Sequence, residues 1–120
     1  MGWSVIYYQK SNGEVPVLDF LLSLNTKLRA KAFSELELLQ KHGPSLREPY
    51  VKAIKGDLYK GLYELRIRFS SDISRIFYFS AMNQTYVLLH GFIKKSEETP
   101  KRELERAKRY MMDYELRCEQ

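Results

Sequence analysis

The sequence has little of the chemistry that builds disulfide scaffolds or metal centres. Its 120 residues include one cysteine, Cys118, and two histidines, His42 and His90. A single cysteine cannot form an internal disulfide or a cysteine-based zinc site, and it fits a reducing compartment. We therefore expect a cytoplasmic protein that holds no metal ion.

Long apolar runs and cofactor motifs are also missing. No segment approaches the ~20 apolar residues of a membrane-spanning helix. The first ten residues have no basic flank followed by an apolar run, so we expect neither a signal peptide nor membrane association. The sequence has no glycine-rich phosphate loop, no His-x-x-x-His pair, no acidic cluster suited to Mg²⁺ and no Gly-x-Ser-x-Gly elbow. Any catalysis would therefore depend on side chains alone, without a cofactor.

What is present is an ordinary globular composition with unevenly placed positive charge. Hydrophobic residues make up 44% and charged residues 29% of the chain, which predicts one domain spanning residues 1–120. The net charge is +5, and residues 50–95 hold eight lysines and arginines against three acidic residues. This local excess favours a polyanionic partner such as nucleic acid, although a basic surface also serves solubility.

The segment Lys55–Pro100 predicts three antiparallel strands joined by short turns. Leu62–Phe69 alternates between apolar and charged residues, as expected of a strand with one buried face. Ile73–Ser80 follows a Ser-Ser-Asp turn, and Thr85–Ile93 is more evenly apolar, as expected of a central or doubly covered strand. A short strand near Val51–Ile54 precedes them.

Charge at strand positions marks this sheet as more than a scaffold. The charged residues of its predicted outer face and of the exit from its last strand are Glu64, Arg66, Arg68, Arg75, Lys94 and Lys95. A sheet that only had to be stable would not need a row of arginines on one face.

The segments before the sheet predict a strand and a helix hairpin. Trp3–Gln9 is rich in aromatic and β-branched residues, which favours a strand. Val15–Leu24 predicts a short helix, and a second helix should run from an N-cap at Asn25-Thr26 to about His42, before Gly43-Pro44. The apolar faces of this hairpin need the sheet as their partner.

A last helix is predicted to open at Thr99-Pro100, with Leu104, Ala107, Met111 and Tyr114 as its apolar stripe. The fold class is therefore α+β. We expect a small, twisted, mainly antiparallel sheet with an N-terminal helix hairpin packed on one face and a C-terminal helix.

The tyrosines have two interpretations. The chain has nine of them. Tyr7, Tyr63, Tyr78 and Tyr86 are expected in the sheet core with their hydroxyls at its rim. The alternative is that they stack on nucleic-acid bases.

The charged residues of the sheet suit one reaction class, which is the cleavage of RNA through its own 2′-hydroxyl. The substrate supplies the nucleophile, so the protein has to orient the phosphate, stabilise negative charge on its oxygens and help to move two protons. Arginine suits this task because its planar guanidinium binds two phosphate oxygens at once.

Three runs of the sequence, LYELRIRF, SRIFY and LLHGFIKKSEETPKRELERAKR, resemble the RelE/ParE toxin superfamily. The resemblance is closest to its HigB-like branch, also described as phage-derived Gp49-like proteins, and "GFIKK…TP…E…A" is its most specific part. It covers residues 50–110 by motif and implies a RelE-like fold. It also implies the toxin of a bacterial type II toxin–antitoxin system. In the RelE and HigB branches such a toxin is a metal-independent endoribonuclease that cuts mRNA on the ribosome.

The resemblance assigns roles to individual residues. Arg66 and Arg75 are expected to hold the scissile phosphate, and Lys94 to position RNA or protonate the leaving oxygen. Strand alternation, rather than the resemblance, puts His90 on the same face as Lys94, where it could act as general acid or base with an unperturbed pKa of about 6.5. The expected substrate-binding residues are Lys55, Glu64, Arg68 and Lys95.

Each role has a structural alternative. The two arginines could form cross-strand ion pairs with Glu64 or Asp72 that only stabilise the sheet. His90 could be a hydrogen-bonded, half-buried strand residue, and Lys94 and Lys95 could be a solvated strand end.

The resemblance also implies partners. A cognate helix-turn-helix antitoxin of the HigA type is expected, with operator DNA reached only through the toxin–antitoxin complex. The helix hairpin at residues 15–42 and the sheet edges are the candidate docking surfaces. The alternative function is that of the ParE branch, in which a non-catalytic toxin binds and inhibits DNA gyrase.

Overall fold

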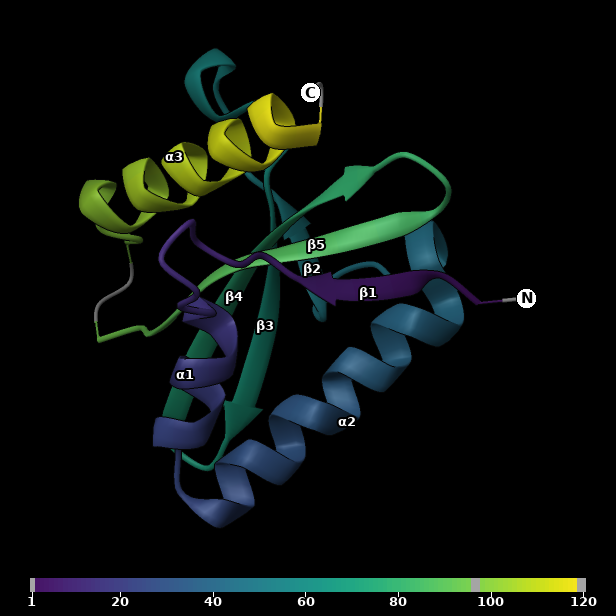
Figure 1. Ribbon diagram of the computed structural model, residues 1–120. Coiled ribbons are helices and arrows are strands. Elements are labelled where there is room, and N and C mark those ends of the chain that lie inside the picture. The colour runs from purple at the N-terminus through teal and green to yellow at the C-terminus, as the bar shows by residue number, and fades with distance from the viewer. Residues whose placement is uncertain (1, 96–97, 119–120) are drawn as a thin grey trace.

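A five-stranded sheet lies between two layers of helices (Figure 1). The computed structural model describes residues 2–95 and 98–118. Its elements are β1 (Ser4–Tyr7), α1 (Pro16–Ser23), α2 (Thr26–His42), β2 (Val51–Ala53), β3 (Tyr63–Phe69), β4 (Asp72–Ala81), β5 (Thr85–Ile93) and α3 (Lys101–Cys118). Short 3₁₀ turns cover Gly43–Ser45 and Asp57–Tyr59.

The strand order is β1-β5-β4-β3-β2. The strands β2 to β5 pair in antiparallel fashion, whereas β1 pairs with β5 in parallel, with Ser4 opposite Thr85. The predicted α+β class and mainly antiparallel sheet are therefore confirmed. The evenly apolar strand β5 lies between two neighbours, as its sequence predicted.

The helices α1 and α2 cover one face of the sheet. Buried side chains of the two helices, including Leu21 and Leu36, pack with Leu65, Ile67 and Ile76 of the strands. The Asn25 side chain accepts a hydrogen bond of 2.9 Å from the backbone nitrogen of Leu28, which confirms the predicted N-cap of α2.

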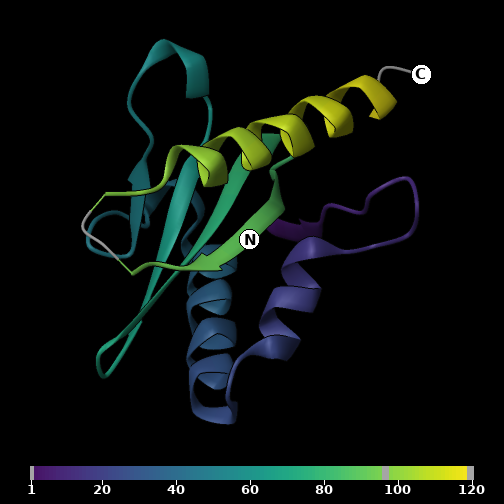
Figure 2. The same cartoon turned by 90° about the vertical axis from the view of Figure 1, so that its left-hand side faces the viewer.

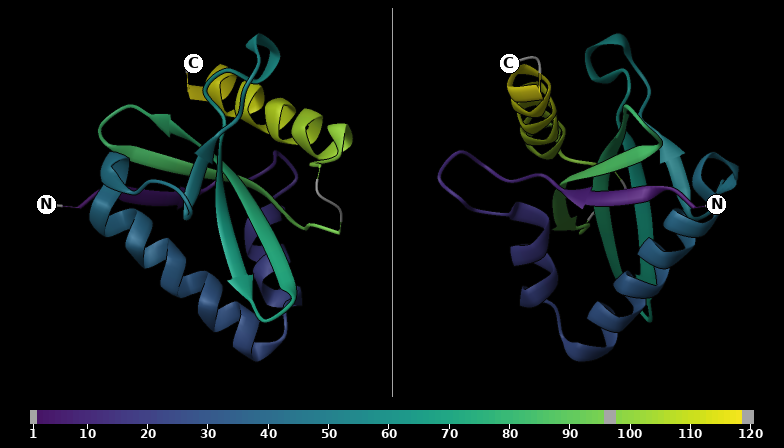
Figure 3. Two further views of the ribbon diagram at one scale, coloured as in Figure 1. Left: turned by 180° about the vertical axis from the view of Figure 1, so that it is seen from behind. Right: turned by 45° about the vertical axis from the view of Figure 1, so that its right-hand side comes forward.

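The helix α3 covers half of the opposite face. Its buried residues Ala107 and Met111 pack against a second cluster that contains Phe77, Val87 and Leu89. Figure 2 shows α3 on one side of the sheet and α1 and α2 on the other. The loop with the turn Asp57–Tyr59 stands beside α3 (Figure 3), where Lys108 Nζ lies 5.9 Å from the centre of the Tyr59 ring. The part of this face that α3 does not cover carries charged residues.

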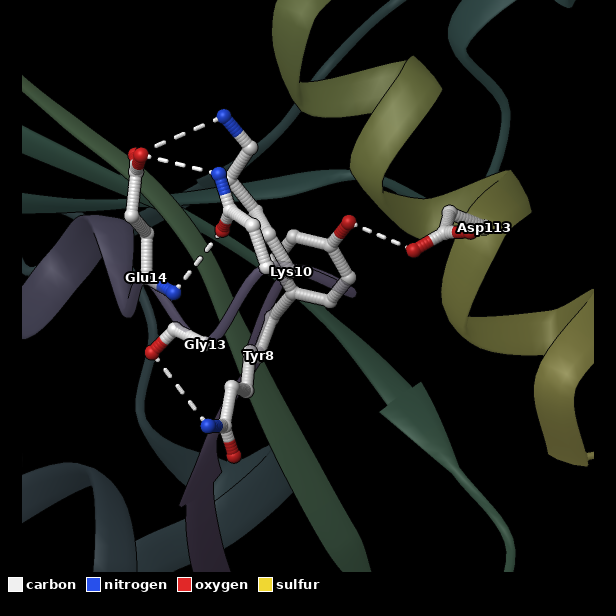
Figure 4. A network of polar contacts seen from close by, with 7 residues as sticks. Tyr8, Lys10, Gly13, Glu14 and Asp113 are labelled. Atoms are coloured by element: carbon white, nitrogen blue, oxygen red, sulfur yellow. Dashed lines mark hydrogen bonds and ion pairs between the residues drawn. The ribbon is translucent and has the colours of Figure 1, made fainter.

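Polar contacts hold the far end of α3 to the segment after β1. The Tyr8 hydroxyl donates a 2.6 Å hydrogen bond to Asp113 Oδ2 (Figure 4), which Arg117 also contacts at 2.7 Å. Burial, together with Asp113, raises the pKa of Tyr8 to about 12, so its hydroxyl remains a donor at neutral pH. In the same loop, Asn12 and Lys10 both contact Glu14. The N-terminal segment after β1 thus helps to fix the position of the C-terminal helix α3.

The N-cap gives a test of the helix hairpin. Asn25→Ala should lower the free energy of unfolding by about 1 kcal/mol, because the nitrogen of Leu28 loses its side-chain acceptor. Urea unfolding measures the change. Asn25→Ser, which keeps a capping oxygen, is the matched control and should stay within a few tenths of a kcal/mol of the wild type. An equal loss in both variants would refute the capping role.

Candidate functional site

The uncovered half of the α3 face forms a basic cleft of about 490 Å³. Its lining residues are Arg66, Arg68, Ser71, Ile73, Arg75, Lys94 and Lys95. Five of these seven are cationic and none is acidic. The β3–β4 hairpin and the exit of β5 supply all of them. A cleft lined by one sign of charge concentrates its electrostatic field, here to the advantage of an anion.

Two arginines face each other across the strands of this cleft. Arg66 of β3 is directly opposite Arg75 of β4 in the antiparallel register. Like charges in this position destabilise a sheet. Glu64 offsets the repulsion, because its Oε1 accepts a 3.2 Å hydrogen bond from Arg66 Nε and lies 3.6 Å from Arg75 Nε. One carboxylate oxygen of Glu64 therefore contacts both guanidinium groups.

The group is buried but its hydrogen bonding is incomplete. Glu64 and Arg75 are each 3% exposed. Glu64 Oε2 and Arg75 Nε have no hydrogen-bond partner, and Arg75 Nη1 donates only to the backbone oxygen of Ser74, at 3.3 Å. Buried polar groups in folded proteins are usually hydrogen-bonded, so Glu64 and Arg75 keep hydrogen-bonding capacity that the chain itself does not use.

Arg75 is a buried cation with two cationic neighbours. Burial lowers its pKa, Glu64 opposes that shift, and the neighbours Arg66 and Arg68 lower it further. An arginine nevertheless stays protonated in proteins. Its remaining N–H groups are therefore available as donors to an oxyanion.

Lys94 faces the same charges at the exit of β5. Its backbone nitrogen donates to the oxygen of Ile73 at 2.8 Å, which fixes the position of its main chain. Burial lowers the pKa of Lys94, and Arg75 lowers it further. A lysine with a lowered pKa gives up its proton more readily, which is the property that a general acid needs.

Lys52 was not among the site residues predicted from the sequence. It lies on the edge strand β2 directly opposite Glu64, and its charge also lowers the pKa of Lys94. The alternation of Val51 and Lys52 on the predicted strand could have shown that Lys52 shares a face with the charged residues of β3.

His90 lies under α3 and does not line the basic cleft. It is 8% exposed, its Nε2 is 3.2 Å from Glu103 Oε1, and its ring meets the ring of Tyr110 edge to face. Burial lowers the pKa of His90, and the bond to Glu103 offsets only part of that shift. The expectation of an ordinary pKa was therefore wrong, because the helix removes water from the imidazole.

Of the eight residues singled out in the sequence, five line the cleft and Glu64 contacts two of them. Lys55 instead lies exposed in the loop after β2, outside the lining, and His90 is covered by α3. The sequence placed both on the correct segment, but it could not show the path of the loop or the position of the helix.

Two kinds of feature are absent from the part of the chain that the structure describes. Within residues 2–95 and 98–118, no three His, Cys, Asp or Glu side chains are grouped so that they could hold a metal ion. In the same part of the chain, no helix has the length and apolar character needed to cross a membrane.

Comparison with known proteins gives a family. Residues 19–112 match the model of the family described as "Phage derived protein Gp49-like (DUF891)". The chain belongs to this family. The Gp49-like family is part of the RelE/HigB-like toxin group, and toxins of this kind have antitoxin partners. No curated protein matches the chain. The residues of the basic cleft lie within the matched segment.

The role of Glu64 can be tested by removing its charge. Glu64→Gln should lower the free energy of unfolding by about 3 kcal/mol, because two opposed guanidinium groups lose the carboxylate that contacts them both. Sulfate, compared with chloride at equal ionic strength, should recover more stability in this variant than in the wild type by binding both arginines. Urea unfolding in the two salts measures this.

Glu35→Gln is the matched control. Glu35 is equally buried and pairs with Lys31 at 2.9 Å, but it lies on α2. It should lose stability without a specific gain in sulfate. An equal response of both variants to sulfate would contradict an anion site between Arg66 and Arg75.

The buried imidazole predicts a pH dependence. The folded chain resists protonation of His90, whereas the unfolded chain takes up that proton below a pH of about 6.5. The free energy of unfolding should therefore fall as the pH is lowered from 7.5 through 6.5 to the lower folded pKa. His90→Gln should reduce this slope, as measured by denaturant unfolding at a series of pH values.

His42→Gln, at the exposed end of α2, is the matched control and should keep the slope because His90 is still present. If both variants behave like the wild type, His90 does not cause the pH dependence.

Proposed function

We propose that this Gp49-like chain is the toxin of a bacterial type II toxin–antitoxin system and that it acts as an endoribonuclease. Its substrate is mRNA on the ribosome, and its reaction proceeds through the RNA 2′-hydroxyl without a metal ion. The observation that carries this proposal is the pair Arg66–Arg75, opposed across two strands and held by the single carboxylate of Glu64. The membership in a toxin family supports it.

The proposed mechanism begins with the scissile phosphate in the basic cleft. Arg66 and Arg75 bind its non-bridging oxygens and stabilise the charge that develops on them in the transition state. Glu64 is a positioning residue, because it contacts the two guanidinium groups and is itself almost fully buried. Arg68 and Lys95 bind neighbouring phosphates of the strand.

The bond changes are those of an internal displacement. The 2′-oxygen loses its proton and attacks phosphorus, the bond from phosphorus to the 5′-oxygen breaks, and a 2′,3′-cyclic phosphate and a 5′-hydroxyl result. Lys94 donates the proton to the leaving 5′-oxygen, a role that its lowered pKa supports. His90 can take the proton of the 2′-hydroxyl only if its Nε2 exchanges Glu103 for the substrate.

The proposed partners follow from the proposed toxin function. A helix-turn-helix antitoxin of the HigA type neutralises the toxin in the cytoplasm, and operator DNA is bound only by their complex. The alternative is a toxin that binds DNA gyrase without cleaving RNA. The convergence of five cations in one cleft that α3 leaves open favours the nuclease.

The decisive variant is Arg66→Ala. Induction of the wild-type chain should arrest growth and produce discrete cuts inside translated codons, as mapped by primer extension on cellular mRNA. Arg66→Ala and Arg75→Ala should reduce cleavage by at least a hundredfold, because each removes a bidentate contact to the transition state. Arg66→Lys should recover little, since an ammonium lacks the planar fork.

Arg109→Ala is the matched control, since it removes an exposed arginine of α3 that lies outside the cleft. It should leave cleavage unchanged. Each variant must still fold and bind the antitoxin, and cleavage should persist in the presence of a chelator. Growth arrest with intact mRNA would refute the nuclease and make gyrase the next target to assay.

A further inference from the structure

A second concave site lies at the C-terminal end of α2, where the turn Gly43–Ser45 faces strands β2, β3, β4 and β5. It is a pocket of about 190 Å³ lined by Trp3, Gly43, Pro44, Leu46, Val51, Tyr63, Tyr78, Ser80 and Tyr86. None of these residues belongs to the basic cleft. No side chain of the lining is charged, so the pocket suits a neutral group.

Aromatic rings form a continuous wall of this pocket. The rings of Trp3 and Tyr86 stack at 4.4 Å, Tyr86 meets Tyr78 edge to face at 5.0 Å, and Tyr78 stacks with Tyr63 at 5.6 Å. Tyr63 is 38% exposed, so one end of the wall is open to solvent. A planar ring that enters there can stack on an aromatic face already held in place.

Gly43 makes room for this wall. A β-carbon at this position would lie 2.5 Å from Trp3 Cδ1, closer than such contacts occur, and the residue has a positive φ of 52°. The backbone of Trp3 is fixed by a 2.8 Å hydrogen bond from its nitrogen to the oxygen of Gln40. The C-terminal end of α2 and Gly43 therefore hold the Trp3 indole in its position.

The polar groups of the pocket are hydroxyls. Three tyrosines and Ser80 supply them, and each hydroxyl can donate and accept a hydrogen bond. Burial raises the pKa of Tyr78, and its neighbours Tyr86 and Tyr63 raise it further, so this hydroxyl keeps its proton at neutral pH. A ring with donors and acceptors along one edge matches this set better than a purely apolar ring.

The size of the pocket and the residues around it limit the class of ligand that can bind. Its volume is below the ~300–1,000 Å³ of pockets that enclose drug-sized ligands, so it admits a ring system but not an attached sugar and phosphate. Those groups would remain outside. The exposed residues Lys41 and Arg47 flank the lining segment 43–46 in the chain, and Lys52 follows Val51.

We propose that this aromatic pocket binds an unpaired nucleobase of an RNA strand. The inference rests on the proposed function only in naming RNA as the source of the base. Val51 lines the pocket, whereas the next residue, Lys52, is opposite Glu64 on the edge strand β2. In this proposal an RNA strand passes around the edge strand β2, with one base in the aromatic pocket and its phosphate backbone beside Lys52.

Trp3 makes the proposal testable without any cleavage assay, because it is the only tryptophan of the chain. Its fluorescence, excited at the red edge where nucleosides absorb little, should be quenched saturably by adenosine and by uridine. Tyr63→Leu should weaken this binding about tenfold, since it removes a stacking face, and Tyr63→Phe should retain most of it.

Arg66→Ala is the matched control on the other face. Nucleosides carry no phosphate, so this variant should show the same quenching as the wild type even though its RNA cleavage is lost. The proposed base site and the proposed nuclease can therefore fail separately.

Two outcomes would overturn the proposal. The first is a lack of saturable quenching by any of the four nucleosides. The second is tighter binding of 3-methylindole or 4-methylphenol than of nucleosides, which would identify an aromatic side chain of a protein partner as the occupant.

Discussion

The candidate site depends on the ion pairs that the Glu64 carboxylate makes with Arg66 and Arg75. This carboxylate lies between two arginines that the antiparallel register places directly opposite each other, and both guanidinium groups contact the same oxygen. A buried carboxylate in this position makes two buried or half-buried cations compatible with a folded sheet. It neutralises only part of their charge, because Lys94, Arg68 and Lys95 add three further cations to the cleft. The same arrangement therefore stabilises the sheet and leaves an electropositive surface, so the structural and the functional interpretations of these arginines are compatible.

Most of the fold could be predicted from the sequence because its signals are local. The alternation along β3, the N-cap at Asn25 and the stop at Gly43 each fix one element with chemistry that lies within a few residues. The parallel pairing of β1 with β5 has no such signal, since residues 4–7 meet residues 85–88. The position of α3 over half of the basic face is equally non-local, and it depends on the packing of Ala107 and Met111 on Phe77.

The same division explains which site residues could be predicted. The cleft brings together Arg66, Arg75 and Lys94 because neighbouring strands carry them. The sequence could predict this, since it predicts that these strands are antiparallel neighbours. His90 was assigned to the correct face, but its burial beneath α3 and its bond to Glu103 depend on a helix whose position was not legible. The tyrosines were expected as sheet core with hydroxyls at the rim. Tyr63, Tyr78 and Tyr86 do lie in the sheet, but with Trp3 they also line a pocket, which only the three-dimensional packing reveals.

The pairing of β1 with β5 has a consequence for the order of events during synthesis. The strand β1 can join the sheet only beside residues 85–88, so it must wait until those residues have left the ribosome. Lys94 and Lys95, which complete the basic cleft, emerge later still. Early nascent chains thus carry the arginines of β3 and β4 without the lysines that share their cleft. The proposed nuclease would therefore have an incomplete basic cleft until the residues after β5 have been synthesised.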